Sequence, residues 1–213
     1  MTQDLIQGAA EFKRYHYESD SDLMGTLVKM GQDPKYFIIS CIDSRCNPGT
    51  IFRAQPGIFF AHKAMGAIVR PYHQGTALAA ALQFAINYNK IETIIVLGHT
   101  KCGAIKALVE NLDDPEITSF IHVAKHAHNI AEAACITPDE IICRTEEEVI
   151  LESTENLKHY PSVAHALAAK KISVKSWQFD IENGNLREYD ENAKEFKILT
   201  TEPLKEDSRV ENA

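Results

Sequence analysis

The sequence predicts an α/β fold in which helices flank a mostly parallel central β-sheet. Short apolar runs of strand length recur at 36–40, 58–61 and 93–97. Runs this uniformly apolar are typical of strands buried on both faces of a parallel sheet. Longer stretches with helical character separate these runs, and strands that alternate with helices favour a parallel sheet between helical layers.

The first 31 residues are expected to form a helical arm. Residues 4–31 have helical character, interrupted near 19–21, where Ser and Asp could cap a second helix. The segment 42–57 contains two Pro-Gly pairs and is expected to be a long loop between the first two strands.

The middle of the chain is predicted to be mainly helical around one strand. Residues 75–90 are Ala-rich and apolar nearly all round, which indicates a buried helix before the strand at 93–97. A helix is expected over 103–111, and two more helical stretches over 116–158. Pro161 is suited to the first turn of a helix that continues to residue 169.

The C-terminal part is predicted to return to strands. Residues 174–181 have strand character, and Asn183-Gly184 forms a turn of hairpin type before a strand at 186–189. The polar tail 200–213 is expected to be mobile. No repeat or linker interrupts the pattern, so residues 1–213 are expected to form a single domain.

Charge and cysteine content narrow the class of protein. A formal net charge of -8 argues against binding to nucleic acid or to an anionic membrane. No stretch is long and apolar enough to span a bilayer, and the start lacks the pattern of a secretory signal. A cytoplasmic location is therefore expected. In that reducing compartment the five cysteines are better suited to metal binding or catalysis than to disulfides.

Two motifs directly follow predicted strands. One is Cys41-Ile42-Asp43-Ser44-Arg45, and the other is His99-Thr100-Lys101-Cys102-Gly103. Loops at the carboxyl ends of neighbouring parallel strands meet, so Cys41, His99 and Cys102 can share one metal ion. Two thiolates and one imidazole with an open fourth position are typical of catalytic zinc. Each motif alone is a weak signal, but together they strongly predict a zinc site.

The two motifs resemble those of the β-class carbonic anhydrases, and the resemblance covers about residues 20–190. Further similar segments lie on both sides of the motifs. They are Gly31-Gln32-Asp33-Pro34-Lys35, Gln55-Pro56-Gly57 followed by Phe59-Phe60, His159-Tyr160-Pro161, and Ser176-Trp177-Gln178-Phe179-Asp180 with the Asn183-Gly184 turn.

The resemblance implies an enzyme that reversibly hydrates carbon dioxide to bicarbonate and a proton, with one zinc ion per chain. It assigns Cys41, His99 and Cys102 as the metal ligands. Asp43 would orient the reactive water. Arg45 would pair with Asp43 in the two-point geometry that guanidinium offers carboxylate, which keeps Asp43 ionised and off the metal.

The resemblance also implies contributions from outside the metal loops. Gln32, supplied by the partner subunit, would donate its amide to a substrate oxygen. Phe60, Phe84 and Gly103 are expected to line the substrate pocket. The N-terminal helices are expected to pack on a partner subunit, in a homodimer or homotetramer.

One segment departs from the family pattern. Lys63 replaces the usual arginine, and Ala64 and Ala67 replace asparagines, which puts efficiency, substrate contacts or dimer packing in doubt. Two alternatives therefore stay open: a hydrolase of carbon disulfide or carbonyl sulfide on the same fold, or a non-catalytic zinc-binding module. The retained Asp43, Arg45 and Gln32 argue against the second, because a purely structural site needs none of them. The acidic run at 146–148 is interpreted as a solvated helix face.

Overall fold

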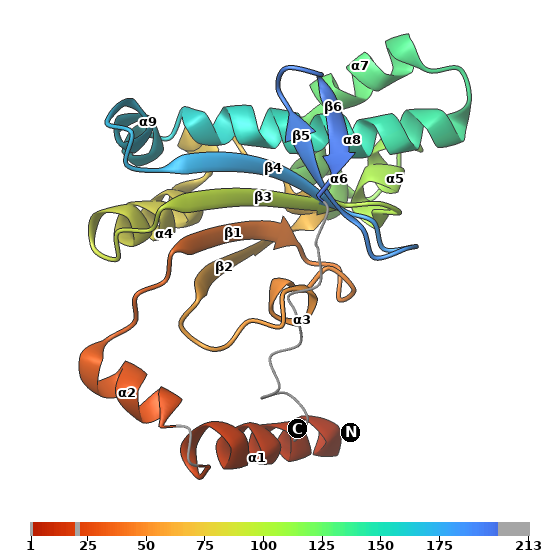
Figure 1. Ribbon diagram of the computed structural model, residues 1–213. Coiled ribbons are helices and arrows are strands. Elements are labelled where there is room, and N and C mark those ends of the chain that lie inside the picture. Colours follow the sequence, from red (N-terminus) through yellow and green to blue (C-terminus); the bar gives the residue numbers. More distant parts are fainter. Residues whose placement is uncertain (1, 20–21, 200–213) are drawn as a thin grey trace.

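The computed structural model describes residues 2–19 and 22–199, and the predicted tail 200–213 lies outside this part of the chain. A six-stranded sheet forms its centre, with strand order β2-β1-β3-β4-β5-β6 (Figure 1). The first four strands in this order are parallel and the last two are antiparallel, so the predicted α/β fold is confirmed. The strands are β1 (Tyr36–Cys41), β2 (Phe59–Ala64), β3 (Thr93–His99), β4 (Ser173–Phe179), β5 (Leu186–Asp190) and β6 (Glu195–Ile198).

Helices fill the connections between the first four strands, β1 to β4. Along 116–158, where two helical stretches were predicted, the structure has three α-helices, and a short helix interrupts the predicted loop 42–57. The helices are α1 (Gln3–Tyr17), α2 (Leu23–Met30), α3 (Pro48–Ile51), α4 (Thr76–Asn87), α5 (Gly103–Val109), α6 (Pro115–Ile121), α7 (Lys125–Ala134), α8 (Pro138–Lys158) and α9 (Pro161–Ala168).

The long helix α8 begins at a capping box. The Thr137 hydroxyl accepts a hydrogen bond from the Glu140 N–H at 3.3 Å, and the Glu140 carboxylate accepts one from the Thr137 N–H at 3.0 Å. Two backbone donors that have no partner inside the helix are thereby satisfied. This cap gives α8 a defined start, and α8 packs against β3, β4 and α5.

The two faces of the sheet have different cores. Phe37 and Ile39 of β1 point into a large core that contains residues of α4, α8 and α9. Ile38, on the opposite face of the same strand, belongs to a smaller core with Cys46 and residues near α3. The alternation follows from the two-residue period of a strand and confirms that β1 is buried on both faces.

The N-terminal helices α1 and α2 lie apart from the sheet, below α3 in Figure 1. Neither helix has a buried residue. Large apolar side chains on both stay exposed, among them Leu5, Phe12, Val28 and Met30. Packing of this arm on a partner subunit remains a prediction.

The register of β1 and β3 determines where the two motifs meet. The strands are parallel neighbours, and Ser40 is opposite Leu97. Cys41 ends β1 and His99 ends β3, so both side chains lie at the same edge of the sheet. Among the described helices, none is both long and apolar enough to cross a membrane.

Candidate metal centre

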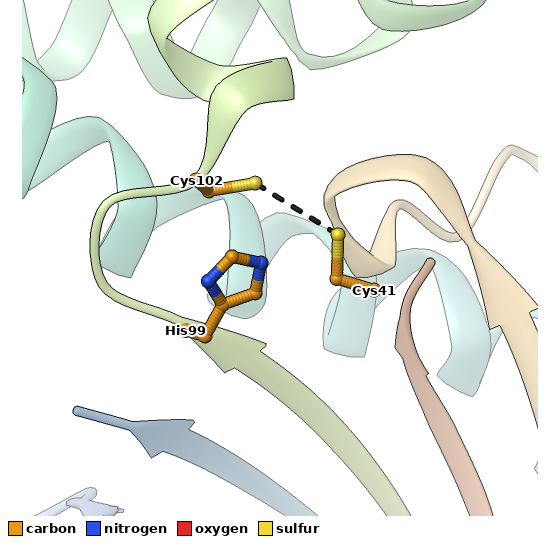
Figure 2. Close-up of side chains that lie close together, drawn as sticks. All are labelled: Cys41, His99 and Cys102. Carbon is orange, nitrogen blue, oxygen red and sulfur yellow. Dashed lines mark hydrogen bonds between the residues drawn. The ribbon is translucent and has the colours of Figure 1, made fainter. Parts of the chain in front are cut away.

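Cys41, His99 and Cys102 converge at the carboxyl edge of the sheet (Figure 2). Their ligand atoms all lie within 4.8 Å of one another, and the two sulfur atoms are 3.9 Å apart. All three residues are at most 3% exposed. The three residues predicted as metal ligands are therefore brought together in a buried cluster.

The imidazole of His99 tests whether a metal ion fits the cluster. Its Nδ1 is hydrogen-bonded to the Thr100 carbonyl oxygen at 2.8 Å, so this nitrogen carries the proton. Its Nε2 is buried without a hydrogen-bond partner. A buried nitrogen lone pair is costly to leave unsatisfied, and a metal ion would satisfy it. With two adjacent sulfur ligands the donor set fits zinc.

The two thiols differ in how readily they lose a proton. The hydrogen bond from the Cys102 thiol lowers the pKa of Cys41 to about 4, with support from His99 and from the Asp43 N–H at 3.5 Å. The same hydrogen bond and burial raise the pKa of Cys102. Burial lowers the pKa of His99, but its contacts with Cys41 and the Thr100 carbonyl outweigh this and raise it. Cys41 is therefore the thiol of the pair that loses its proton more readily.

Asp43 and Arg45 form an ion pair next to the cluster. Arg45 donates from its backbone N–H and from Nε to Asp43 Oδ1, at 2.9 and 3.0 Å, and from Nη2 to Oδ2 at 2.8 Å. These bonds lower the pKa of Asp43 well below its usual range. Asp43 Oδ2 lies 3.9 Å from His99 Nε2, so an ionised carboxylate faces the metal ligands.

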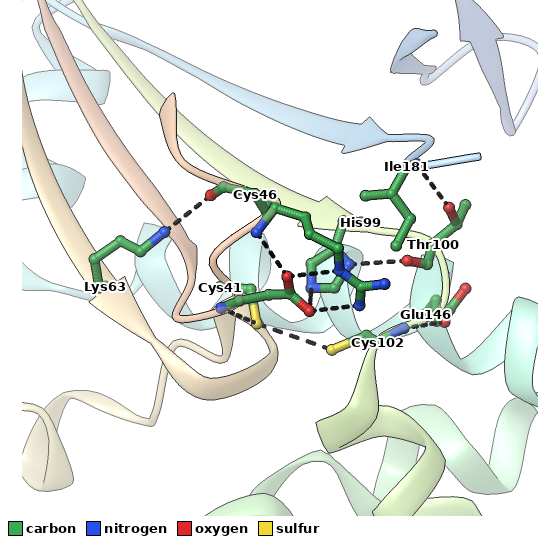
Figure 3. Close-up of polar contacts among 10 residues, drawn as sticks. Cys41, Cys46, Lys63, His99, Thr100, Cys102, Glu146 and Ile181 are labelled. Carbon is green, nitrogen blue, oxygen red and sulfur yellow. Dashed lines mark hydrogen bonds and ion pairs between the residues drawn. The ribbon is translucent and has the colours of Figure 1, made fainter. Parts of the chain in front are cut away.

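The loop that carries His99 is attached to the end of β4. Thr100 donates its hydroxyl proton to Asp180 Oδ1 at 3.2 Å. The Thr100 hydroxyl also accepts the Ile181 N–H at 3.1 Å, as Figure 3 shows. The Thr100 N–H also donates to the Phe179 carbonyl at 3.0 Å. These supporting roles could not be predicted from the sequence, because the contacts join segments eighty residues apart.

The atypical segment 62–67 contacts the Asp43 loop from the side. Lys63 Nζ donates to the Cys46 carbonyl oxygen at 2.9 Å, a single bond where a guanidinium could make two. Ala67 is fully buried with a φ of 54°. This left-handed conformation is one that asparagine adopts more readily than alanine. Alanine at position 67 therefore keeps the left-handed backbone conformation, although asparagine is the residue type that favours it.

The interpretation of residues 146–148 as a solvated face is wrong. Glu146 and Glu148 are 3% and 8% exposed. Glu146 Oε1 accepts the Cys102 N–H at 2.8 Å, and burial raises the pKa of Glu146 to about 7. The spacing of residues along α8 could have predicted this burial. Glu146 lies on the same helix face as three buried residues, Ile150, Ser153 and Leu157.

Three of the remaining predicted site residues do not surround the metal ligands of their own chain. Phe60 is opposite Phe37 of β1. Phe37 precedes Cys41 by four residues, which places Phe60 roughly 13 Å from Cys41 along the strand direction. The centroids of the Phe84 and Phe60 rings are 6.3 Å apart, and Phe84 is 52% exposed. Gln32 is exposed and precedes the amino end of β1. These three residues therefore lie toward the opposite edge of the sheet from Cys41.

Gly103, by contrast, does lie beside the metal ligands. It lines a cavity of about 400 Å³ together with Cys102, Lys101 and Glu146. This cavity reaches Cys102 from the side of α8. The prediction of a substrate-pocket role for Gly103 stays a prediction.

Comparisons with known proteins agree with this geometry. A family model described as carbonic anhydrase matches residues 36–186. Beta carbonic anhydrase 5, chloroplastic, of Arabidopsis thaliana is 33% identical over 178 residues, which cover 80% of this chain and 59% of that relative. The structure of the β-carbonic anhydrase CcaA has a TM-score of 0.85 at 29% identity, covering 93% of this chain and 99% of that one. A tetrameric β-carbonic anhydrase of Sordaria macrospora has a TM-score of 0.77 at 25% identity, covering 88% of this chain and 94% of that one.

Proposed function

This chain belongs to the β-class carbonic anhydrase family, and from that premise we propose that it is an enzyme for the reversible hydration of carbon dioxide to bicarbonate. The observation that carries the proposal is the buried Nε2 of His99, which has no hydrogen-bond partner and lies beside the sulfur atoms of Cys41 and Cys102. These three residues would hold one zinc ion per chain. When bound there, zinc supplies the Lewis acidity that makes water a nucleophile near neutral pH.

Asp43 is proposed to orient the attacking water. Its carboxylate faces the ligands and is held ionised by Arg45, so it can only accept a hydrogen bond. A water whose proton points at Asp43 has a lone pair free for the carbon of carbon dioxide. Arg45 fixes both oxygens of the carboxylate in one plane, which would keep Asp43 from becoming a metal ligand itself.

Gln32, Phe60 and Phe84 are proposed to act in the site of a second copy of the chain. Support comes from their placement away from their own metal ligands and from the exposure of Phe84. The exposed apolar side chains of α1 and α2 offer a further surface for subunit contact. The proposed assembly is a homodimer or homotetramer, consistent with the tetrameric relative from Sordaria macrospora.

A cytoplasmic location is also part of the proposal. All five cysteines are free thiols, and two of them are required as metal ligands. Thiols persist in reducing compartments, whereas oxidation of Cys41 with Cys102 would abolish the zinc site.

Single substitutions of the ligands test the proposed function. Cys41→Ala, His99→Ala and Cys102→Ala should each lose zinc and carbon dioxide hydration together. Cys135→Ala is the matched control, because Cys135 lies at the end of α7 outside the cluster. Hydration that persists in metal-free ligand variants would overturn the proposal.

A further inference from the structure

Residues 146–150 of helix α8 contact both ends of the metal-binding loop, which runs from Gly98 to Cys102. At one end, Glu146 Oε1 accepts the Cys102 N–H at 2.8 Å (Figure 3). At the other end, Ile150 packs on Gly98, the residue before His99, so closely that a Cβ on Gly98 would lie 2.5 Å from two Ile150 carbons. Glu146 and Ile150 are one helical turn apart and share a face. The loop between Gly98 and Cys102 is therefore fixed to one rigid helix.

The loop needs such support because its backbone is strained. Lys101, between the two ligands of this loop, adopts a φ of 56°. A non-glycine residue in this left-handed conformation persists only when its surroundings impose it. The side chain of Lys101 gives little support, because its contact with Glu182 at 3.7 Å is between two exposed groups.

Glu146 is a buried acidic residue and not part of a solvated helix face. It is 3% exposed, and its Oε1 accepts a hydrogen bond from the backbone N–H of Cys102, a proposed metal ligand. Its neighbour Glu148 is buried to a similar degree but pairs with Arg144 on the same helix. The two acids thus offer a comparison in which only one touches the metal-binding loop.

We propose that Glu146 is a positioning residue for the zinc site, which holds the Cys102 backbone so that the Cys102 sulfur stays in place beside Cys41 and His99. The length of the Glu146 side chain determines this role, because the hydrogen bond connects α8 to the loop at a fixed distance. The negative charge is secondary, since a neutral oxygen in the same place accepts the same N–H. This inference rests on the proposed zinc site and adds a residue to it that touches neither metal nor substrate.

Two substitutions separate reach from charge. Glu146→Asp keeps the carboxylate but shortens the side chain by one methylene, which withdraws the acceptor from Cys102. Glu146→Gln keeps the length and an oxygen acceptor but removes the charge. Glu148→Asp is the matched control on the same helix. All three changes are small enough for the fold to be retained, and urea unfolding of each variant measures its stability in parallel.

The readout is the zinc dissociation constant, measured by competition with a chelator, together with the thiolate-to-cobalt absorption of the Co²⁺-substituted protein. Glu146→Asp should weaken zinc binding about tenfold or more and shift the cobalt spectrum. Glu146→Gln and Glu148→Asp should stay close to wild type in both. Equal zinc affinity in Glu146→Asp and wild type would overturn the positioning role but leave the proposed function standing. A wild-type protein that binds no zinc would overturn both.

Discussion

The side chain of Arg45 donates to both carboxylate oxygens of Asp43, from Nε at 3.0 Å and from Nη2 at 2.8 Å. The backbone N–H of Arg45 adds a third bond at 2.9 Å. The Asp43 side chain is 17% exposed and that of Arg45 is 58% exposed, so the pair spans the boundary between the metal ligands and solvent. The acid that faces the ligands is thereby fixed from the solvent side.

Arg45→Ala should lower kcat/KM for carbon dioxide hydration about tenfold to a hundredfold without loss of zinc. Arg45 lowers the pKa of Asp43, so its removal raises that pKa toward the ordinary value. The ionised form of Asp43 is then lost at a higher pH as the solution is acidified. A pH–rate profile should show the acidic limb of the variant shifted upward.

Arg45→Lys is the control for this prediction. It keeps the positive charge but cannot donate to both carboxylate oxygens in one plane, so its rate should fall between those of wild type and Arg45→Ala. Unchanged kcat/KM in Arg45→Ala at every pH would mean that the ion pair has no part in the reaction.

The proposed contribution from a second subunit predicts complementation between inactive variants. Gln32→Ala and Asp43→Ala should each be nearly inactive alone. If each site takes Gln32 from one chain and Asp43 from the other, a mixed dimer has one intact site. Random exchange of subunits should then restore about a quarter of the wild-type activity.

The comparison sample for this experiment is each variant taken through the same exchange alone. Activity that stays at the level of the separate variants, although mass spectrometry detects mixed dimers, would place Gln32 and Asp43 in the same chain's site or show that Gln32 is dispensable.

Gly98→Ala should destabilise the protein by about 1–3 kcal/mol, because the new methyl group overlaps Ile150. Ile150→Ala alone should also destabilise it, by about 2–5 kcal/mol, because Ile150 is 1% exposed. Urea unfolding of both single variants and the double variant measures their coupling. The double variant should be more stable than the sum of the two losses predicts. Strict additivity would show that the two residues do not press on each other.

Cys46 should be inert toward alkylation in the folded protein. It is fully buried, and burial raises its pKa to about 12. At pH 8 almost every Cys46 thiol is then protonated, and the thiolate is the reactive form. Iodoacetamide followed by peptide mass mapping should label the exposed Cys143 before Cys46. Labelling of both at the same rate would contradict the packing around Cys46.

The metal centre could be predicted from the sequence because its ligands directly follow strands whose apolar runs are unmistakable. Cys41 is the last residue of β1 and His99 is the last residue of β3. The parallel pairing of these strands brings the two side chains to the same edge of the sheet. The pairing of Asp43 with Arg45 was implied by the family resemblance, and it forms within one short loop. These features depend on local sequence and on a general rule for parallel sheets.

Other features depend on contacts between distant segments and could not be predicted in this way. Glu146 belongs to a run of three acids, and composition favours a solvated face until the period of α8 is considered. β6 was not predicted, because Glu195–Ile198 is short and alternates charged with apolar residues at the edge of the sheet. The motif that contains Phe60 carries no information on which copy of the chain it serves.

The decisive measurement is stopped-flow carbon dioxide hydration from acid to alkaline pH, with zinc assayed on the same protein. We expect about one zinc per chain and a fast rate that rises with pH, since two thiolates nearly cancel the charge of zinc and leave water less acidic than an all-histidine site would. Full zinc occupancy with no hydration at any pH would show that the chain is not a carbonic anhydrase.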